Sequence, residues 1–490
     1  MSSLEKYFES YRNNVIGYDQ TFETPQGIKK LIYADWTASG RMYAPIEERM
    51  MKDFGPFVGN THTETTVTGT YMTEAYHTAH EIIKKHVNAG ANDVIITQGS
   101  GMTGVIAKFQ RMLGLRVPEQ MSKYVRIPDE EKPVVFVTHM EHHSNHTSWL
   151  ETIADVECIP PDEHGAVNLN YLHEILKKYQ NRKAKIASVT ACSNVTGIQT
   201  PYYKIARIMH QAGGLCFVDF ACSAPYVKID MHPEDPLEKL DAIYFSPHKF
   251  LGGPGTPGVL IFDSKLYTNK IPDQPGGGTV DWTNPWGGHK FLDNIEARED
   301  GGTPPFLQTI KAALCVRLKE KMGVESMRRR EEEIVDILFK ELPKIDKLNI
   351  LAAQTKDRLA VVSFYIDGLH YNLGVKLLND YFGIQTRGGC SCAGTYGHYL
   401  LHIPQDVSNK ITEKIDHGDM SEKPGWIRLS IHPIMTNDEV NYIIRSLQEV
   451  VTNFETWGKD YTYNPHTNEY CHNTFNSRKL SPVHKWMDVG

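Results

Sequence analysis

Between residues 93 and 262 the chain alternates short runs of β-branched and aromatic residues with segments whose apolar residues recur at helical spacing. Strands are predicted at residues 93–97, 134–138, 156–160, 186–190, 215–219, 242–245 and 259–262. Helical spacing is clearest over residues 169–179 and 203–212. Strands that alternate with helices predict an α/β fold, with a mostly parallel sheet covered by helices on both faces. In such a sheet, ligands bind beyond the carboxyl ends of the strands.

A chain of 490 residues is too long for one simple core, so we expect more than one packed unit. A glycine-rich region, residues 276–305, ends the predicted sheet unit, and a charged helix near residues 327–342 opens a smaller one. Residues 403–424 are polar and predict a long irregular excursion on the surface. The expected domains are an N-terminal arm of the small domain (1–30), a large domain (31–310), a small α+β domain (311–452) and a C-terminal extension (453–490).

Composition argues against several classes of protein. The formal charge of −7 leaves no basic excess for binding nucleic acid. The sequence has no run of about 18 uncharged apolar residues, and its N-terminus lacks the features of a signal peptide. We therefore expect no membrane span. The eight cysteines are scattered without a paired framework, which favours a reducing compartment, the cytoplasm.

Lys249 ends the segment Phe245-Ser-Pro-His-Lys249, which follows a predicted buried strand and runs directly into glycines. A buried position is costly for a charged amine unless the amine is used, and burial favours the uncharged form that makes a Schiff base. Ser246 and His248 are suitable hydrogen-bond donors for a phosphate. The alternative is an ordinary surface lysine in the loop between a strand and a helix.

Two further features support a cofactor site at the same edge of the sheet. Asp219 ends a predicted strand, where its carboxylate could pair with a pyridinium nitrogen and keep the ring an electron sink. Ser100 and Gly101 form a Gly-Ser-Gly turn between a strand and a helix, where backbone N–H groups can hold an anion. Taken alone, such an aspartate is more often a helix cap, and most such turns bind nothing.

Four histidines, His139, His142, His143 and His146, are spaced three and four residues apart. This spacing could indicate zinc, but a zinc site needs a closed set of three or four ligands on rigid elements. An imidazole that lies flat over a cofactor ring explains one of them more simply, and hydrogen bonding explains the others. We therefore expect no metal.

Four stretches resemble the class V aminotransferase family of fold-type-I pyridoxal 5′-phosphate (PLP) enzymes, and within it the cysteine desulfurases and selenocysteine lyases. These stretches are Glu141-His-His-Ser-Asn145, Asp219, Phe245-Ser-Pro-His-Lys249 and Arg387-Gly-Gly-Cys-Ser-Cys-Ala393. The resemblance spans roughly residues 30 to 450. It implies a large domain with a mostly parallel seven-stranded sheet, a smaller α+β C-terminal domain, and PLP as the cofactor of an enzyme that acts on an amino acid.

The resemblance also implies a role for each matching residue. Lys249 would hold PLP and later move protons, His142 would stack on the ring, Asp219 would pair with the ring nitrogen and Asn194 would lie beside the phenolic oxygen. The phosphate would be held by Ser100, Gly101, Ser246 and His248, joined by Thr303 of a second subunit. That last contact implies a homodimer with shared active sites. Arg428 would bind the substrate carboxylate, for which its planar fork is suited.

Cys392 matches the thiol that takes the sulfur in desulfurases, so our first hypothesis is conversion of L-cysteine to L-alanine with a persulfide on Cys392. A mobile glycine-rich loop suits such transfer, a sulfur-acceptor protein is a possible partner, and Arg387 or His398 could stabilise the thiolate. Cys390 could relay sulfur or form a disulfide. The alternative is that both cysteines are buried small residues in a turn.

Two other hypotheses stay open. One is a class V aminotransferase, epimerase or other PLP lyase without sulfur transfer. The remote one is a non-catalytic scaffold of the PLP fold. The sequence also departs from the desulfurase pattern, because Cys222 stands where that pattern has a glutamine three residues after the aspartate. Extra segments occur near residues 113–132, 402–424 and 452–490.

Overall fold

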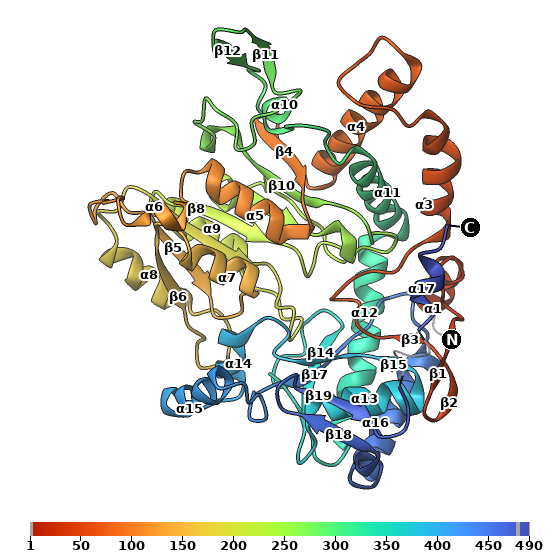
Figure 1. Cartoon of the computed structure of the whole chain (residues 1–490). Coiled ribbons are helices and arrows are strands. Elements are labelled where there is room, and N and C mark those ends of the chain that lie inside the picture. Colours follow the sequence, from red (N-terminus) through yellow and green to blue (C-terminus); the bar gives the residue numbers. More distant parts are fainter. Residues whose placement is uncertain (1–2, 477–480, 490) are drawn as a thin grey trace. The chain divides into compact units, whose positions relative to one another are not determined.

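The computed structural model describes residues 3–476 and 481–489 (Figure 1). The chain divides into two compact units. The large unit comprises Asn14–Ile16 and Thr37–Arg328, and the small unit comprises the described parts of Met1–Asn13, Gly17–Trp36 and Arg329–Gly490. The division falls after Arg328 rather than near residue 310, because α11 (Phe306–Met322) packs along α4 (Val67–His86) in the large unit.

The large unit is built on a seven-stranded sheet. Its order is β4 (Asp93–Gln98), β10 (Gly258–Asp263), β9 (Ala242–Phe245), β8 (Leu215–Asp219), β7 (Lys185–Thr190), β5 (Val134–Thr138) and β6 (Asp155–Ile159). Only β10 runs antiparallel to its neighbours, so the other six strands are parallel to one another. The predicted α/β fold with a mostly parallel sheet is thus confirmed, and these six strands present their carboxyl ends at one edge.

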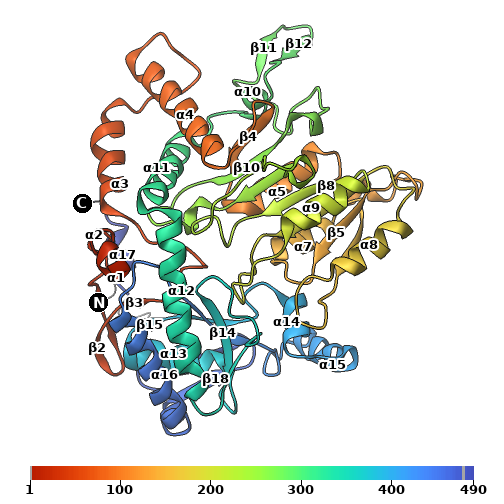
Figure 2. The same ribbon diagram turned by 180° about the vertical axis from the view of Figure 1, so that it is seen from behind.

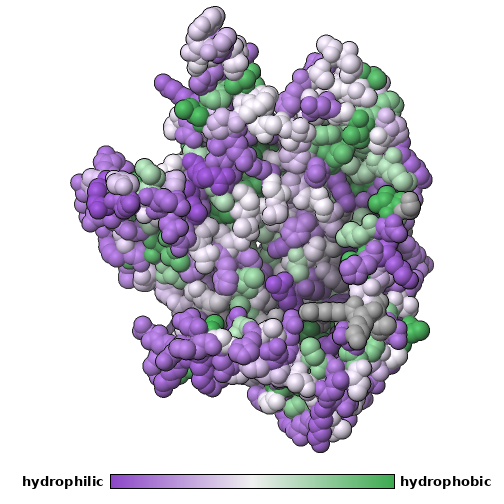
Figure 3. Space-filling view, in the orientation of Figure 1, coloured by the Kyte–Doolittle hydropathy of each residue, from purple (hydrophilic) through white to green (hydrophobic). Residues whose placement is uncertain are grey.

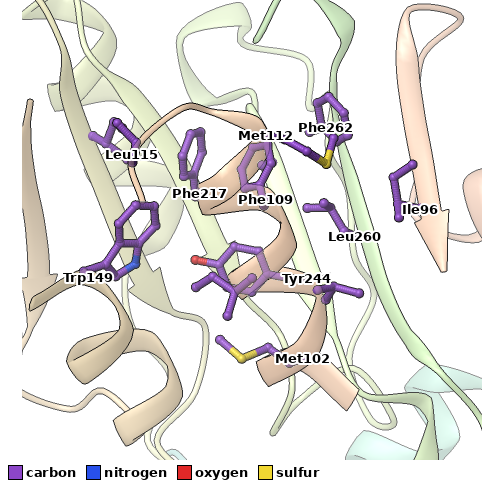
Figure 4. Packing of buried hydrophobic residues seen from close by; sticks show 14 of the residues in the cluster. Ile96, Met102, Phe109, Met112, Leu115, Trp149, Phe217, Tyr244, Leu260 and Phe262 are labelled. Carbon is purple, nitrogen blue, oxygen red and sulfur yellow. The ribbon is translucent and has the colours of Figure 1, made fainter. Parts of the chain in front are cut away.

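Helices cover both faces of this sheet. On one face lie α5 (Gly101–Met112) and α7 (His143–Leu150), and on the other lie α8 (Leu169–Lys178) and α9 (Tyr202–Gln211) (Figures 1 and 2). Under α5, the Phe109 ring lies 5.1 Å from the rings of both Phe217 and Phe262, measured between centroids (Figure 4). The apolar side chains of α5 therefore pack into the core against the sheet. This packing holds the N-terminus of the helix at the edge of the sheet.

The remaining elements of the large unit connect and extend this core. They are α3 (Ala44–Arg49), η1 (Met50–Phe54), η2 (Gly55–Phe57), α6 (Glu119–Ser122), η3 (Pro236–Glu238), η4 (Pro247–Lys249), η5 (Ser264–Leu266), β11 (Val280–Thr283), β12 (His289–Phe291) and α10 (Ile295–Glu299). The helix α12 (Val324–Glu341) carries the chain from the large unit into the small one.

The small unit is centred on an antiparallel sheet of four strands. Its order is β13 (Leu348–Ile350), β14 (Val361–Ile366), β17 (Trp426–Ser430) and β16 (Arg387–Gly389). It also contains α13 (Tyr371–Phe382), α16 (Asn437–Trp457) and a parallel pair formed by β3 (Ile32–Tyr33) and β15 (Ile384–Gln385). Its N-terminal elements are α1 (Ser3–Tyr7), α2 (Glu9–Arg12), β1 (Thr21–Thr24) and β2 (Gly27–Lys30). A short turn, η6 (Leu342–Lys344), precedes β13.

Two segments of the small unit are more regular than their sequences predict. The expected irregular excursion contains a helix, α15 (Gln405–Asp416), on which no side chain is buried and whose surface is hydrophilic in Figure 3. Its partner α14 (Gly394–Leu400) is tied to it by the His398 ring, whose Nε2 lies 2.8 Å from Ser408 Oγ. After α16 and η7 (Gly458–Asp460), the extension forms a hairpin of β18 (Tyr461–Asn464) and β19 (Glu469–His472). A last helix is α17 (Val483–Trp486).

Within the described part of the chain, we find no helix with the length and apolar character needed to cross a membrane.

Candidate active site

The four residues predicted to bind a phosphate, Ser100, Gly101, Ser246 and His248, lie together in the large unit where α5 begins, and we call this group the cradle. Ser100 precedes the helix, and Gly101 has a left-handed φ of +67°. The Met102 N–H donates to Ser246 Oγ over 2.8 Å. A Cβ on Gly101 would lie 2.9 Å from Ser246 Oγ and 3.4 Å from His248 Cδ2. The first turn of a helix presents unpaired N–H groups, so the structure brings together the four residues that the sequence predicts for a phosphate.

His248 is held as a neutral ring. Burial, aided by the positive charge of Lys249, lowers the pKa of His248 to about 4. Its carbonyl oxygen accepts hydrogen bonds from Gly40 N–H (2.9 Å) and Ser39 Oγ (3.3 Å). A Cβ on Gly40 would lie 1.9 Å from the Phe250 carbonyl oxygen. Ser39 and Gly40 thus support the turn that carries Lys249. Sequence reasoning missed them, although a small residue followed by glycine is a signal of close backbone packing.

Asp219 and Lys249 lie near enough for their charges to interact. Asp219 is the last residue of β8, and it pairs with Tyr244 of β9, the strand that leads to Lys249. Burial raises the pKa of the Asp219 carboxyl to about 6, against the lowering effects of the Ala221 N–H and of Lys249. The Ala221 N–H donates to Asp219 Oδ1 over 2.8 Å. A buried carboxylate with only this support is suited to receive a further cation.

A buried polar network lies beside Asp219. Glu141 accepts hydrogen bonds from Thr138 Oγ1 (2.6 Å), Thr190 N–H (2.9 Å) and Asn145 Nδ2 (2.7 Å). Burial raises the pKa of Glu141 to about 8, and the charge of Asp219 contributes to the rise. Asn145 Oδ1 in turn accepts from Tyr244 Oη over 2.8 Å. This network joins the carboxyl ends of three strands, β5, β7 and β9, and sequence reasoning did not assign it a role.

His142 caps the N-terminus of α7, which starts beside this network. Its Nδ1 accepts the Ser144 N–H over 3.1 Å, so Nε2 carries the proton of the neutral ring. The other histidines are placed differently: His139 is fully buried, and its Nδ1 lies 3.3 Å from the Ile159 carbonyl oxygen. Throughout residues 3–476 and 481–489, no group of three His, Cys, Asp or Glu side chains is arranged to hold a metal.

Asn194 is buried in the turn after β7. The carbonyl group of the preceding residue, Ser193, is contacted by the thiols of two cysteines. Both Cys192 Sγ and Cys222 Sγ lie 3.7 Å from the Ser193 carbonyl oxygen. The thiol of Cys222 therefore contacts the backbone beside Asn194. Thr303 is exposed after α10, in a segment where the Gly302 N–H donates to a backbone carbonyl of the glycine-rich region.

The other two predicted site residues belong to the small unit. Arg428 is buried on β17, and its Nη2 donates to Asp35 Oδ1 over 2.5 Å. Arg387 of β16 pairs in register with Arg428. The Arg387 guanidinium Nη2 lies 3.9 Å from Cys392 Sγ, so a positive charge stands next to that sulfur. Asp35 had no predicted role.

The cysteine turn directly follows a paired strand, and the mobility expected of it stays a prediction. Both glycines that precede Cys390 belong to β16 and pair with β17. Ser391 and Cys392 have left-handed φ values of +52° and +57°, a conformation that costs free energy for residues other than glycine. His398 makes its contacts with Gly394 and Ser408 instead. The turn is thus a defined and strained conformation.

PLP fits the large-unit residues chemically. Its phosphate matches the cradle at α5, where a side chain on Gly101 would occupy the space beside Ser246 and His248. Its pyridinium nitrogen matches the buried carboxylate of Asp219, and its aldehyde matches the amine of Lys249, whose charge acts on Asp219. The residues present therefore suit a ligand whose anionic group lies in the cradle and whose cationic group lies at Asp219.

Comparisons with known proteins agree with this chemistry. A family model described as aminotransferase class-V matches residues 32–443. A probable cysteine desulfurase of Staphylococcus aureus is 27% identical over 371 residues, which cover 74% of this chain and 84% of that protein. One from Halalkalibacterium halodurans is 27% identical over 368 residues, covering 74% and 84% of the two chains.

Solved structures share the fold. The apo cysteine desulfurase from Thermococcus onnurineus NA1 has a TM-score of 0.73 at 21% identity and covers 91% of this chain and 98% of its own. The cysteine desulfurase CsdA from Escherichia coli has a TM-score of 0.68 at 21% identity and covers 86% of this chain and 94% of its own.

Proposed function

The chain belongs to the class-V aminotransferase family, which makes it a PLP-dependent enzyme, and from that premise we propose that it is a cysteine desulfurase. It removes sulfur from L-cysteine, releases L-alanine and holds the sulfur as a persulfide on Cys392. The observation that carries the proposal is the position of the Arg387 guanidinium, 3.9 Å from Cys392 Sγ. A cation beside a thiol favours the thiolate, which is the nucleophilic form.

The residues of the large unit act on the cofactor. When bound, PLP supplies an electron sink that weakens bonds at the α-carbon of an amino acid. In the proposal, Lys249 holds it through the amine and moves protons to and from the substrate carbon. Asp219 would hold the ring nitrogen of the cofactor in its protonated form, and His142 would cover the ring. Asn194 would bind the ring oxygen, and the cradle residues Ser100, Gly101, Ser246 and His248 would hold the phosphate.

The residues of the small unit act on the substrate. Arg428 binds the substrate carboxylate and gives up part of its contact with Asp35 to do so. Cys392 attacks the substrate sulfur: a new S–S bond forms, the C–S bond of the substrate breaks, and its electron pair goes to the carbon. That carbon takes up a proton, and the product leaves as alanine. The sulfur is then ready for a thiol of an acceptor protein.

We also propose the setting in which this happens. The exposed position of Thr303 suits a contact with the phosphate of a second subunit, which implies a homodimer with shared active sites. Cys392 must be a free thiol at the start of each cycle, so a reducing compartment, the cytoplasm, suits the reaction.

The test is an assay of purified protein with L-cysteine and a thiol reductant. We expect sulfide and alanine in equal amounts. Cys392→Ser should abolish both products and keep the absorbance of the bound cofactor. The matched control is Cys471→Ser, which removes an exposed cysteine of β19 in the same unit and should leave the activity unchanged.

Two outcomes would contradict the proposal. Undiminished alanine formation in Cys392→Ser would show that this thiol takes no part. Conversion of amino acids to keto acids, without sulfide, would favour an aminotransferase of the same family instead.

A further inference from the structure

The tip of the C-terminal hairpin is fastened to the start of α13. Asn468, in the turn between β18 and β19, has a left-handed φ of +57°. Its Nδ2 donates to Tyr371 Oη over 2.6 Å, and its carbonyl oxygen accepts from Asn372 Nδ2 over 2.5 Å. Tyr463 Oη donates to Asn468 Oδ1 over 2.9 Å. One buried asparagine thus joins the extension to the first two residues of the helix.

Tyr371 is also the surface against which β16 packs. A Cβ on Gly388 would lie 3.2 Å from Tyr371 Cδ2 and 2.3 Å from Asn372 Oδ1. A Cβ on Gly425 would lie 2.6 Å from Tyr371 Cε1 and 2.8 Å from Gly389 Cα. The first two residues of α13 therefore leave no room for a side chain at Gly388 of β16 or at Gly425, which directly precedes β17. The tyrosine ring packs directly ahead of the turn that contains Cys392.

The same hairpin tip fastens the segment that follows α15. Met420 N–H donates to the Pro465 carbonyl oxygen over 2.9 Å, and His466 Nδ1 lies 2.7 Å from the Gly418 carbonyl oxygen. A third hydrogen bond to this segment comes from Tyr371 Oη, which donates to the Lys423 carbonyl oxygen over 3.2 Å. The segments before and after the cysteine turn are thus both joined to the tip.

The tip contact can be broken without removing the hairpin. At its base the hairpin is held separately, by Tyr461 Oη, which donates to Asp380 Oδ2 over 2.9 Å. Between base and tip, a cleft of about 860 Å³ is lined by residues of both the hairpin and α13, among them Val375, Lys376 and Tyr470. Contacts at the two ends are therefore independent enough to be tested one at a time.

We propose that the C-terminal hairpin is a positioning element for Cys392, and that Asn468 and Tyr371 are the residues through which it acts. The pair keeps β16 against α13 and so maintains the left-handed turn in which Arg387 contacts Cys392. Without the pair, the strained turn relaxes, because a strained backbone persists only where its surroundings fix it. The inference deepens the proposed function and rests on it only for the role of the thiol.

The test uses the full-length protein without substrate. Asn468→Gly removes the side chain and tolerates the left-handed φ, and Tyr371→Phe removes only the hydroxyl. In both variants we expect amide hydrogen exchange over residues 386–394 to become about tenfold faster. Alkylation of Cys392 by iodoacetamide should become several-fold slower, because the relaxed turn no longer holds the thiol beside Arg387. The exposed Cys471 reports alkylation in the same sample. The matched control is Asn473→Ala, which removes the Thr462 Oγ1 contact of 2.7 Å at the base of the hairpin.

Three results distinguish positioning from general support of the fold. The double variant should accelerate exchange by less than the sum of the two single effects, because both variants break the contact between Asn468 and Tyr371. Exchange in β14 should stay at its wild-type rate, and with L-cysteine the kcat should fall with little change in KM. Unchanged exchange over residues 386–394, or equal acceleration in β14, would overturn the inference. Neither result depends on whether Cys392 accepts sulfur, which the Cys392→Ser assay decides separately.

Discussion

At the scale of single residues, the role proposed for Asp219 in binding the cofactor opposes the stability of the folded chain. Its carboxyl is buried at the end of β8, and burial raises its pKa to about 6. A folded-state pKa above the usual 3.8 means that the ionised form is disfavoured by folding. This unfavourable contribution is absent at low pH and grows as the pH rises through about 6. A cationic ring nitrogen would relieve it.

We therefore predict opposite effects of Asp219→Asn with and without cofactor. In cofactor-free protein at pH 7.5, the variant should be more stable by up to roughly 3 kcal/mol, the equivalent of about two pKa units. The gain should vanish below pH 4, where the wild-type carboxyl is protonated. With PLP the variant should bind the cofactor more weakly. Urea unfolding at several pH values and absorbance titration measure the two effects, and a pH-independent gain would contradict the explanation.

Residues at strand ends could be predicted from sequence because their chemistry and their position coincide. Lys249 and Asp219 each follow a recognisable buried strand. Asp35 gave no such signal, since its contact with Arg428 joins positions 393 residues apart. The role of Glu141 in the buried network could not be predicted for the same reason, because its partners come from three strands that are far apart in the sequence. Long-range pairing is not encoded in local pattern.

At the scale of elements, the two ends of α5 offer a matched comparison. Gly101 at its start and Gly114 just after its end both have left-handed φ, +67° and +71°. A Cβ on Gly101 would enter the cradle, whereas a Cβ on Gly114 would meet nothing within 4 Å. The backbone cost of alanine is then similar at both positions, of order 1 kcal/mol. Only one substitution reaches the anion site.

We predict that Gly101→Ala weakens PLP binding at least tenfold, because the methyl group displaces the phosphate from the helix N-terminus. Gly114→Ala should lower the melting temperature by a similar amount and bind PLP as the wild type does. Dissociation constants from absorbance titration and melting temperatures of cofactor-free protein check both statements. Equal loss of binding in the two variants would mean that backbone strain, rather than the cradle, is responsible.

Elements with strong periodicity were predicted from sequence, and elements held by distant contacts were not. The buried strands of the large unit are short apolar runs, which local pattern identifies. The hairpin β18–β19 has little apolar content, and its stability comes from contacts such as Tyr461 with Asp380 and Asn468 with Tyr371. The glycines of β16 suggested mobility, but their small size serves the packing of Tyr371.

At the scale of the whole molecule, the predicted residues divide between the two units of one chain. The cradle, Asp219 and Lys249 belong to the large unit, and Arg428 with Cys392 belongs to the small unit. Thr303 stands outside both groups, exposed in the large unit. Its proposed role in a partner's site makes the assembly part of the chemistry. That role can be tested by combining defects in different subunits.

We predict that a heterodimer of a Lys249→Ala chain and a Thr303→Asp chain regains about half of the wild-type activity per dimer. Each homodimer should be nearly inactive, since one lacks the amine and the other repels the phosphate in both sites. In the heterodimer, the Lys249 of the Thr303→Asp chain meets the intact Thr303 of its partner, which restores one site. Co-expression with two affinity tags yields these heterodimers for the alanine assay.

The control heterodimer combines Lys249→Ala with Gly101→Ala. Both residues serve the site of their own chain, so each chain damages its own site and no activity should return. Recovery in this control would show that Gly101 and Lys249 serve different sites of the dimer. Failure of the Lys249→Ala and Thr303→Asp pair to recover, with a dimer confirmed by light scattering, would place Thr303 in its own chain's site. The comparison therefore separates a shared active site from two independent ones.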